Sequence, residues 1–111
     1  MNDLRINESL TNIDFVKKTM DQISKDFNRC GWEIEFELNT LIPINEDLTN
    51  QIASQLIRLS ATELQQFIYT VDLQENKFHR AVTMNDDLKS LAGEILKREA
   101  LKVFIRSNFS E

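Results

Sequence analysis

Apolar residues recur at every third or fourth position over residues 12–30, which is the spacing of one face of a helix. Asn12 or Thr11 is suited to cap the start of this helix, and Gly31 is suited to end it in a left-handed conformation. The pattern therefore predicts an amphipathic helix over 12–30. Its apolar stripe is formed by Ile13, Val16, Met20, Ile23, Phe27 and Cys30.

The period changes to two over residues 32–38, where Trp, Ile, Phe and Leu alternate with three glutamates. Strict alternation is typical of a half-buried strand whose polar face meets solvent. This stretch has no obvious partner strand, although residues 77–83 alternate enough to be the best internal candidate. We therefore expect an extended segment at 32–38. Pairing with 77–83, or with the same segment across a dimer, is the alternative.

The helical spacing returns after Pro43 and predicts three further helices over 45–59, 61–73 and 84–107. Asn45 is suited to cap the first of them, and Ser60 to Glu63 match a capping box at the start of the second. Thr83 or Asn85 is expected to cap the last. Residues 74–82 are predicted to be a polar connection.

These patterns predict an all-α fold of about four helices packed as a small bundle, with one extended segment at 32–38. At 111 residues the chain is expected to form a single domain over 1–111. The alternative fold class is α+β, with 32–38 paired to 77–83 or across a dimer.

The composition disfavours most kinds of catalytic or metal site. The chain holds one His, one Cys, two Gly and one Pro, and no phosphate-binding, dinucleotide-binding, zinc or calcium motif is present. We therefore expect no metal, no cofactor and no enzymatic activity. The N-terminus has no apolar run typical of a signal peptide, and no stretch is long and apolar enough to span a bilayer, so we expect a cytoplasmic protein.

The net charge of −5 makes this an acidic protein, and the excess is concentrated in residues 32–59. Lys and Arg neutralise phosphates, and here 13 of them are outnumbered by 18 acids, so nucleic acid is not an expected partner. An anionic membrane surface is disfavoured for the same reason. A protein partner, or a second copy of the chain, remains the expected interaction.

One charged residue falls on an apolar helix face. On a helical wheel Glu99 lies among Ala92, Ile95, Leu96 and Val103, so it is predicted to be buried. A buried carboxylate needs a cation or several donors. Arg58, His79 and Arg80 are candidate partners, and a pocket around Glu99 with His79 or Arg80 would suit a small enzyme or ligand-binding domain. That function is the alternative to an interaction module.

Several large apolar residues lie off the predicted stripes and exceed what one-sided packing needs. Apolar side chains left over after a core is filled often mark interfaces. We therefore expect a non-enzymatic protein–protein interaction module that self-associates, with a homodimer as the simplest assembly. The candidate interface residues are Phe15, Trp32, Phe36, Tyr69, Leu101 and Ile105.

Overall fold

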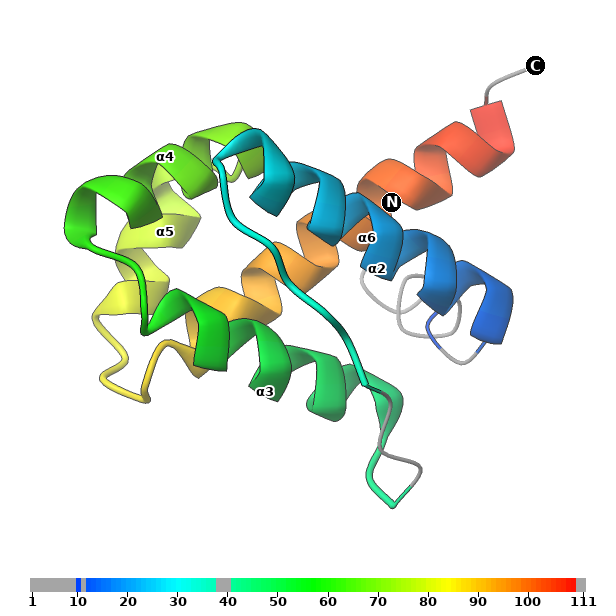
Figure 1. Ribbon diagram of the computed structural model, residues 1–111, viewed down its shortest axis with the longest axis horizontal. Helices are drawn as coiled ribbons and strands as arrows, with labels where there is room; N and C mark the ends of the chain where they lie inside the picture. Colours follow the sequence, from blue (N-terminus) through cyan, green and yellow to red (C-terminus); the bar gives the residue numbers. More distant parts are fainter. Residues whose placement is uncertain (1–9, 11, 38–40, 110–111) are drawn as a thin grey trace.

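The computed structural model describes residues 10, 12–37 and 41–109 of the chain. Within these residues the regular secondary structure is entirely helical, so the predicted all-α class is confirmed (Figure 1). The described helices number five rather than about four. They are α2 (Ile13–Arg29), α3 (Ile44–Leu56), α4 (Ala61–Val71), α5 (Glu75–Val82) and α6 (Lys89–Phe109).

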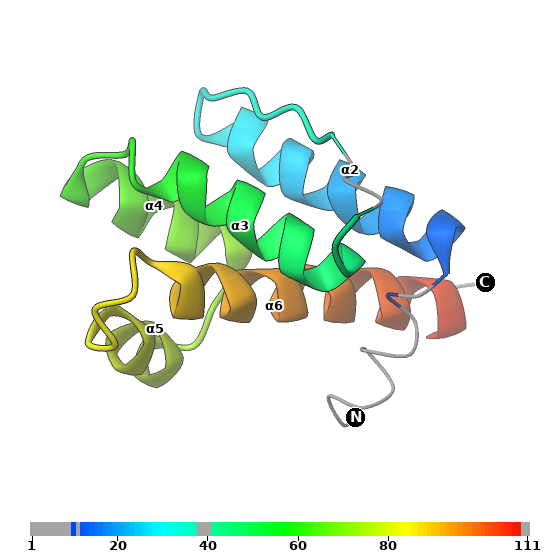
Figure 2. The ribbon, with the colours of Figure 1, turned by 90° about the horizontal axis from the view of Figure 1, so that it is seen from below.

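The 21-residue helix α6 is the centre of the fold and packs against each of the other four described helices. Figure 2 shows α2 and α3 over one side of α6, with α5 beside its first turns. Leu91 and Ile95 on α6 are fully buried in the core. None of the described helices combines the length and apolarity needed to cross a membrane.

Helix α2 matches the predicted helix over 12–30 closely. The Asn12 side chain accepts hydrogen bonds from the backbone N–H groups of Asp14 and Phe15, at 3.0 and 3.2 Å. These bonds satisfy two of the donors that the first turn of a helix leaves unpaired. Gly31 follows the helix at φ +89°, a left-handed conformation that costs glycine least.

The buried face of α2 is rotated from the predicted stripe. Ile13 is 47% exposed, whereas Thr19 and Asp26 are fully buried. Helix α2 packs against both α4 and α6, so its contact face is wider than one apolar stripe. The face therefore extends beyond the stripe on one side, which shifts its centre. This rotation brings polar side chains of α2 to the α6 interface.

Residues 32–37 cross the molecule as an extended segment between α2 and α3 (Figure 1). Their burial alternates as predicted, since Ile34 is buried while Glu33 and Glu35 are exposed. The Gln51 side chain of α3 holds the end of this segment. Its Oε1 accepts from the Glu37 N–H at 3.0 Å, and its Nε2 donates to the Glu37 carbonyl at 2.6 Å.

The alternative in which 32–38 pairs with 77–83 is wrong for the described residues. Residues 32–37 form no strand ladder, and most of the proposed partner stretch, 77–83, is helical. Leu38 lies outside the described residues. The backbone of Glu37 is paired instead with a side-chain amide, so part of the segment's hydrogen bonding is satisfied without a neighbouring strand.

The two middle helices follow the predicted order with small differences at their ends. Helix α3 begins at Ile44 after Pro43, so Asn45 lies inside its first turn and does not cap it. The predicted capping box of α4 is present, with Ser60 Oγ accepting from the Glu63 N–H at 3.2 Å and Glu63 Oε1 accepting from the Ser60 N–H at 2.8 Å. Helix α4 ends at Val71 because Asp72 is left-handed, at φ 65°.

The prediction of a polar connection over 74–82 is wrong, because residues 75–82 form α5. The last helix begins at Lys89 rather than at 84, after left-handed conformations at Asn85, Asp87 and Leu88. Neither Thr83 nor Asn85 caps it. The Asp86 carboxylate instead accepts from the Ser90 N–H at 3.1 Å and from the Ser90 hydroxyl, which holds the pKa of Asp86 below its usual range.

Candidate functional site

Among the described ionisable residues, Glu99 on α6 has the pKa that is shifted furthest from its usual value. Its side chain is fully buried, and Nζ of Lys102, one turn later, lies 2.6 Å from its Oε1. The same Nζ lies 2.9 Å from Oδ2 of Asp26 on α2, which is also fully buried. Two carboxyl groups and one ammonium group therefore meet at the α2–α6 interface. We name Asp26, Glu99 and Lys102 the acid–lysine cluster.

Ordinary helix geometry builds this cluster. Glu99 and Lys102 are three positions apart, so their side chains are neighbours on one face of α6. Lys102 keeps part of its side chain at the surface, with 20% exposure, while its ammonium group reaches inward. Asp26 comes from the face of α2 that is rotated toward α6. The cluster depends on the packing of two helices that are distant in sequence.

The environment of Glu99 favours its protonated form. Burial is the largest cause, and the neighbouring Asp26 carboxyl group adds to it, while Lys102 acts in the opposite direction. Together they raise the pKa of Glu99 from 4.5 to about 8. Neither Glu99 oxygen accepts a well-aligned hydrogen bond from a described residue, even though Lys102 is within ion-pair distance. A protonated Glu99 needs fewer such donors than an ionised one.

A line of polar contacts leads from the cluster toward the surface. Gln22, buried on α2, donates from Nε2 to Asp26 Oδ1 at 3.3 Å, and its Oε1 accepts from Arg106 on α6. Arg29 approaches Asp26 Oδ1 at 3.6 Å from the exposed end of α2. These contacts pair the buried polar groups of Gln22 and Asp26, whereas the Glu99 oxygens accept no well-aligned hydrogen bond from a described residue.

The structure does not bring His79 and Arg80 to Glu99. Both lie exposed on α5, and His79 Nε2 is 3.3 Å from Glu75 Oε1 on the same helix. The expected pocket formed by Glu99 with these two residues is therefore wrong. Since Glu99 has no solvent-exposed surface, a substrate cannot reach it while α2 and α6 stay packed.

Asp26 and Lys102 were not among the predicted site residues. The signal for Asp26 was the spacing of Thr19, Gln22 and Asp26, which are polar residues separated by three and four positions and lie beside the apolar stripe of α2. For Lys102 the signal was its position three residues after a carboxylate predicted to be buried. The spacing along α6 points to Lys102 alone, because Asp26 is a carboxylate on another helix.

The six predicted interface residues fall into two groups. Phe15, Trp32, Phe36 and Leu101 are partly buried and pack against the core. Tyr69 is 88% exposed on α4 and Ile105 is 42% exposed on α6. Of the six, only Tyr69 and Ile105 are largely accessible to solvent, Tyr69 over most of its surface and Ile105 over nearly half.

The outer face of α4 is a second feature of the surface, because it lacks charged side chains. Its exposed residues carry no charge, and the single acidic residue of the helix, Glu63, is engaged in the capping box. Tyr69 stands among these uncharged groups, while Phe67 and Ile68 beside it in sequence are buried. We name this surface the α4 face, which consists of Ala61, Thr62, Gln65, Gln66 and Tyr69.

The described residues contain no group of three or more His, Cys, Asp or Glu side chains arranged to hold a metal ion. Glu33, Glu35 and Glu37 are all exposed, in keeping with a solvated acidic face. Comparisons of the chain with protein-family models, curated proteins and solved structures find no match. The function must therefore be argued from the surface and the buried groups of this chain.

Proposed function

We propose that the protein is a non-enzymatic protein–protein interaction module that self-associates through the α4 face. The observation that carries this proposal is the 88% exposure of Tyr69, in a helix whose other large apolar residues are buried or partly buried. Protein interfaces are enriched in tyrosine and depleted in charged residues at their centres. The α4 face has both properties, because it presents an exposed tyrosine with threonine and glutamine on the same helix. The nearest charge after Tyr69 in the chain, Asp72, is paired with Arg98.

A second copy of the chain is the partner that this surface favours. Twofold self-contact places the same patch of each subunit against itself. In a protein with a net charge of −5, a patch that included carboxylates would set like charges against one another. The α4 face avoids this repulsion because it is uncharged. Its glutamine and threonine side chains supply both donors and acceptors, so they can pair with their own copies.

The alternative, a small enzyme or ligand-binding domain centred on Glu99, has less support. Its proposed partners His79 and Arg80 are at the surface of α5, and Glu99 itself is closed to solvent. A buried ion-pair cluster between two helices is a common structural arrangement that also perturbs pKa values. We therefore favour the interaction module, and we retain the cytoplasm as its proposed location.

The proposal is tested by measuring the mass of the protein in solution over a range of concentrations, by sedimentation velocity or light scattering. We expect a mass above that of one subunit, which rises with concentration. Tyr69→Glu places a charge in the centre of the α4 face, and we expect it to shift the protein to monomer. Tyr69 is exposed, so this change leaves the core intact.

The matched control is Met84→Glu, which places the same charge on another exposed apolar residue, 60% accessible, between α5 and α6. We expect this variant to associate as the wild type does. A wild-type protein that is monomeric at every concentration would overturn the proposal. Equal dissociation by both variants would also count against it, because it would point to net charge rather than to the α4 face.

A further inference from the structure

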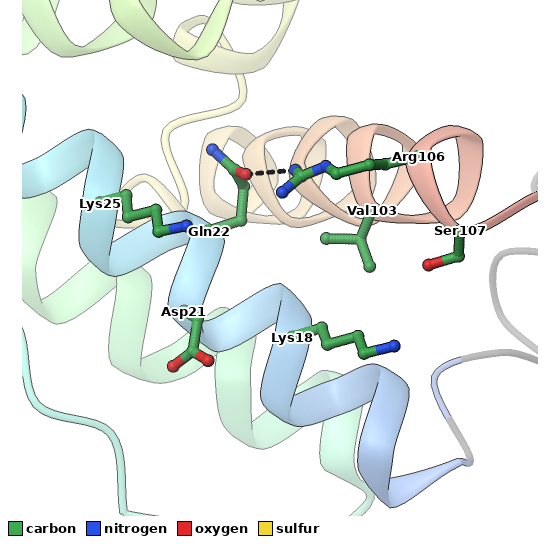
Figure 3. Close-up of a pocket in the computed structure, with 7 residues that line it drawn as sticks. All are labelled: Lys18, Asp21, Gln22, Lys25, Val103, Arg106 and Ser107. Carbon is green, nitrogen blue, oxygen red and sulfur yellow. Dashed lines mark hydrogen bonds between the residues drawn. The ribbon is translucent and has the colours of Figure 1, made fainter. Parts of the chain in front are cut away.

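A groove runs between α2 and α6 next to the acid–lysine cluster. Its volume is about 390 Å³, which is within the range of pockets that hold small molecules, roughly 300–1,000 Å³. Figure 3 shows Arg106 reaching from α6 to Gln22 on α2, which joins the two walls. The lining residues are Lys18, Asp21, Gln22, Lys25, Val103, Arg106 and Ser107.

The charge of this groove is opposite to that of the whole protein. Among the described residues that line it, three side chains are cationic and one is a carboxylate, so this part of the groove is positive although the chain has a net charge of −5. Lys18 and Lys25 are seven positions apart on α2, which places them about two turns apart on the same side of the helix. The cations therefore come from both walls of the groove.

The two lysines are not neutralised by their own helix. The sequence offers Asp14 four positions before Lys18 and Asp21 four positions before Lys25, a spacing that often closes into ion pairs. In the structure neither lysine forms an ion pair with a described residue. Their ammonium groups therefore remain available to a ligand.

The groups that line the groove suit a phosphate. Lysine ammonium groups, the arginine guanidinium and the Ser107 hydroxyl are all donors, and hydrogen bonds from charged donors to phosphate oxygens are among the strongest in proteins. The two lysines, which form no ion pair with a described residue, match the charge of a phosphate monoester, which carries about −1.5 to −2 at neutral pH. A cationic ligand would be repelled by three like charges in the groove. Binding of a long nucleic acid is disfavoured because the chain as a whole is acidic.

We propose that the groove between α2 and α6 binds a small phosphate-bearing anion, with Lys18 and Lys25 on one wall and Arg106 and Ser107 on the other. Gln22 is a positioning residue in this site, since it accepts a hydrogen bond from Arg106 and holds the guanidinium across the groove. This binding site is independent of the α4 face, so either proposal can stand without the other.

The test is a titration of the isotope-labelled full chain with inorganic phosphate, followed by amide chemical shifts, with sodium chloride at equal ionic strength as the reference. We expect saturable shifts confined to residues 18–25 and 103–107. We expect Lys18→Glu combined with Lys25→Glu to weaken phosphate binding by about tenfold or more, because two charged donors are lost. Both lysines are exposed, so the fold is retained.

The control is Lys77→Glu combined with Lys89→Glu, which changes the net charge by the same amount at two other exposed positions. We expect this control to bind phosphate nearly as well as the wild type. The proposal is overturned if phosphate and chloride give the same shifts, if the response does not saturate, or if both double variants weaken binding equally.

Discussion

The ammonium group of Lys102 lies 2.9 Å from Oδ2 of Asp26, a residue 76 positions earlier in the chain. This contact ties α2 to α6 through a carboxylate that has no exposed surface. The same ammonium group serves Glu99, so one cation offsets two buried acids. Removing it would leave Glu99 without its ion-pair partner, and Asp26 with Arg29, at 3.6 Å, as its remaining described cation.

We expect Lys102→Met to lower the free energy of unfolding by about 3–5 kcal/mol, the usual cost of breaking a buried ion pair from one side. Methionine retains most of the aliphatic stem, so the loss reports mainly on charge. Urea unfolding at pH 7 measures it. Lys97→Met is the control, since Lys97 is more exposed and 3.9 Å from Glu94. A loss no larger than that of the control would show that the acid–lysine cluster does not stabilise the packing of α2 against α6.

The pKa of Glu99 predicts a specific dependence of stability on pH. Because this pKa is raised from 4.5 to about 8 in the folded state, the folded protein holds more protons than the unfolded chain between these values. The contribution of Glu99 to stability is therefore complete below pH 4.5. It falls as the pH rises toward 8, with a slope of at most about 1.4 kcal/mol per pH unit.

Glu99→Gln removes this titration. The free energy of unfolding of the variant relative to wild type should rise steadily between pH 5 and pH 8, whatever constant cost the amide adds. Denaturant unfolding at a series of pH values measures the difference. Glu94→Gln, on the same helix but partly exposed, should leave the slope unchanged. A constant difference between Glu99→Gln and wild type would show that Glu99 is ionised throughout.

Gln51 is expected to control how firmly the extended segment is held. In Gln51→Ala both side-chain hydrogen bonds to the backbone of Glu37 are lost. We expect a loss of about 1–2 kcal/mol in the free energy of unfolding and faster amide exchange at Glu37. Gln65→Ala, on the exposed face of α4, should have neither effect. Unchanged exchange at Glu37 would mean that other contacts fix the segment.

The two glycines are predicted to respond in opposite directions to alanine. Gly93 lies inside α6, and a Cβ atom there would meet nothing within 4 Å, so Gly93→Ala should stabilise the protein by about 1 kcal/mol through helix propensity. Gly31 also has free space, but its φ of +89° strains any L-residue. Gly31→Ala should therefore destabilise by about 1 kcal/mol or more.

Thermal or urea unfolding of both variants checks this pair of predictions. Destabilisation by Gly93→Ala would show that a backbone or partner approaches α6 at this position after all. If Gly31→Ala were neutral, the left-handed end of α2 would not contribute to stability.

The elements that the sequence predicted well are those with a local cause. Asn12, Gly31 and the Ser60–Glu63 capping box set helix ends through bonds within a few residues. The alternating burial of 32–37 likewise follows from a period that no helix shares. Glu99 is buried where its helical wheel places it, because it is flanked by apolar residues on a long helix.

Helix α5 was missed because its pattern is ambiguous. Phe78 and Val82 are four positions apart, a spacing that puts two residues on the same side of either a strand or a helix. Ala81, the buried residue of this helix, is the one that favours a helix. The start of α6 at Lys89 could not be predicted from local sequence patterns either. Leu88, just before it, is left-handed at φ 64°, a conformation that leucine rarely adopts.

The partners of Glu99 were missed for a different reason. Which face of α2 meets α6 depends on the packing of α2 against two helices at once, and no local pattern encodes this. The spacing of Gln22 and Asp26 places them beside the apolar stripe of α2, but the sequence alone does not show that α6 covers them, and both are buried.

The position of α6 in the chain has a consequence for synthesis. Helix α6 contacts all four described helices that precede it in the chain. Their apolar faces therefore cannot be fully buried until α6 has left the ribosome. Packing must then close over long sequence separations, which slows folding and lengthens the exposure of apolar surface. A nascent chain that ends before Lys89 should depend on chaperones, whereas one that includes the helix should not.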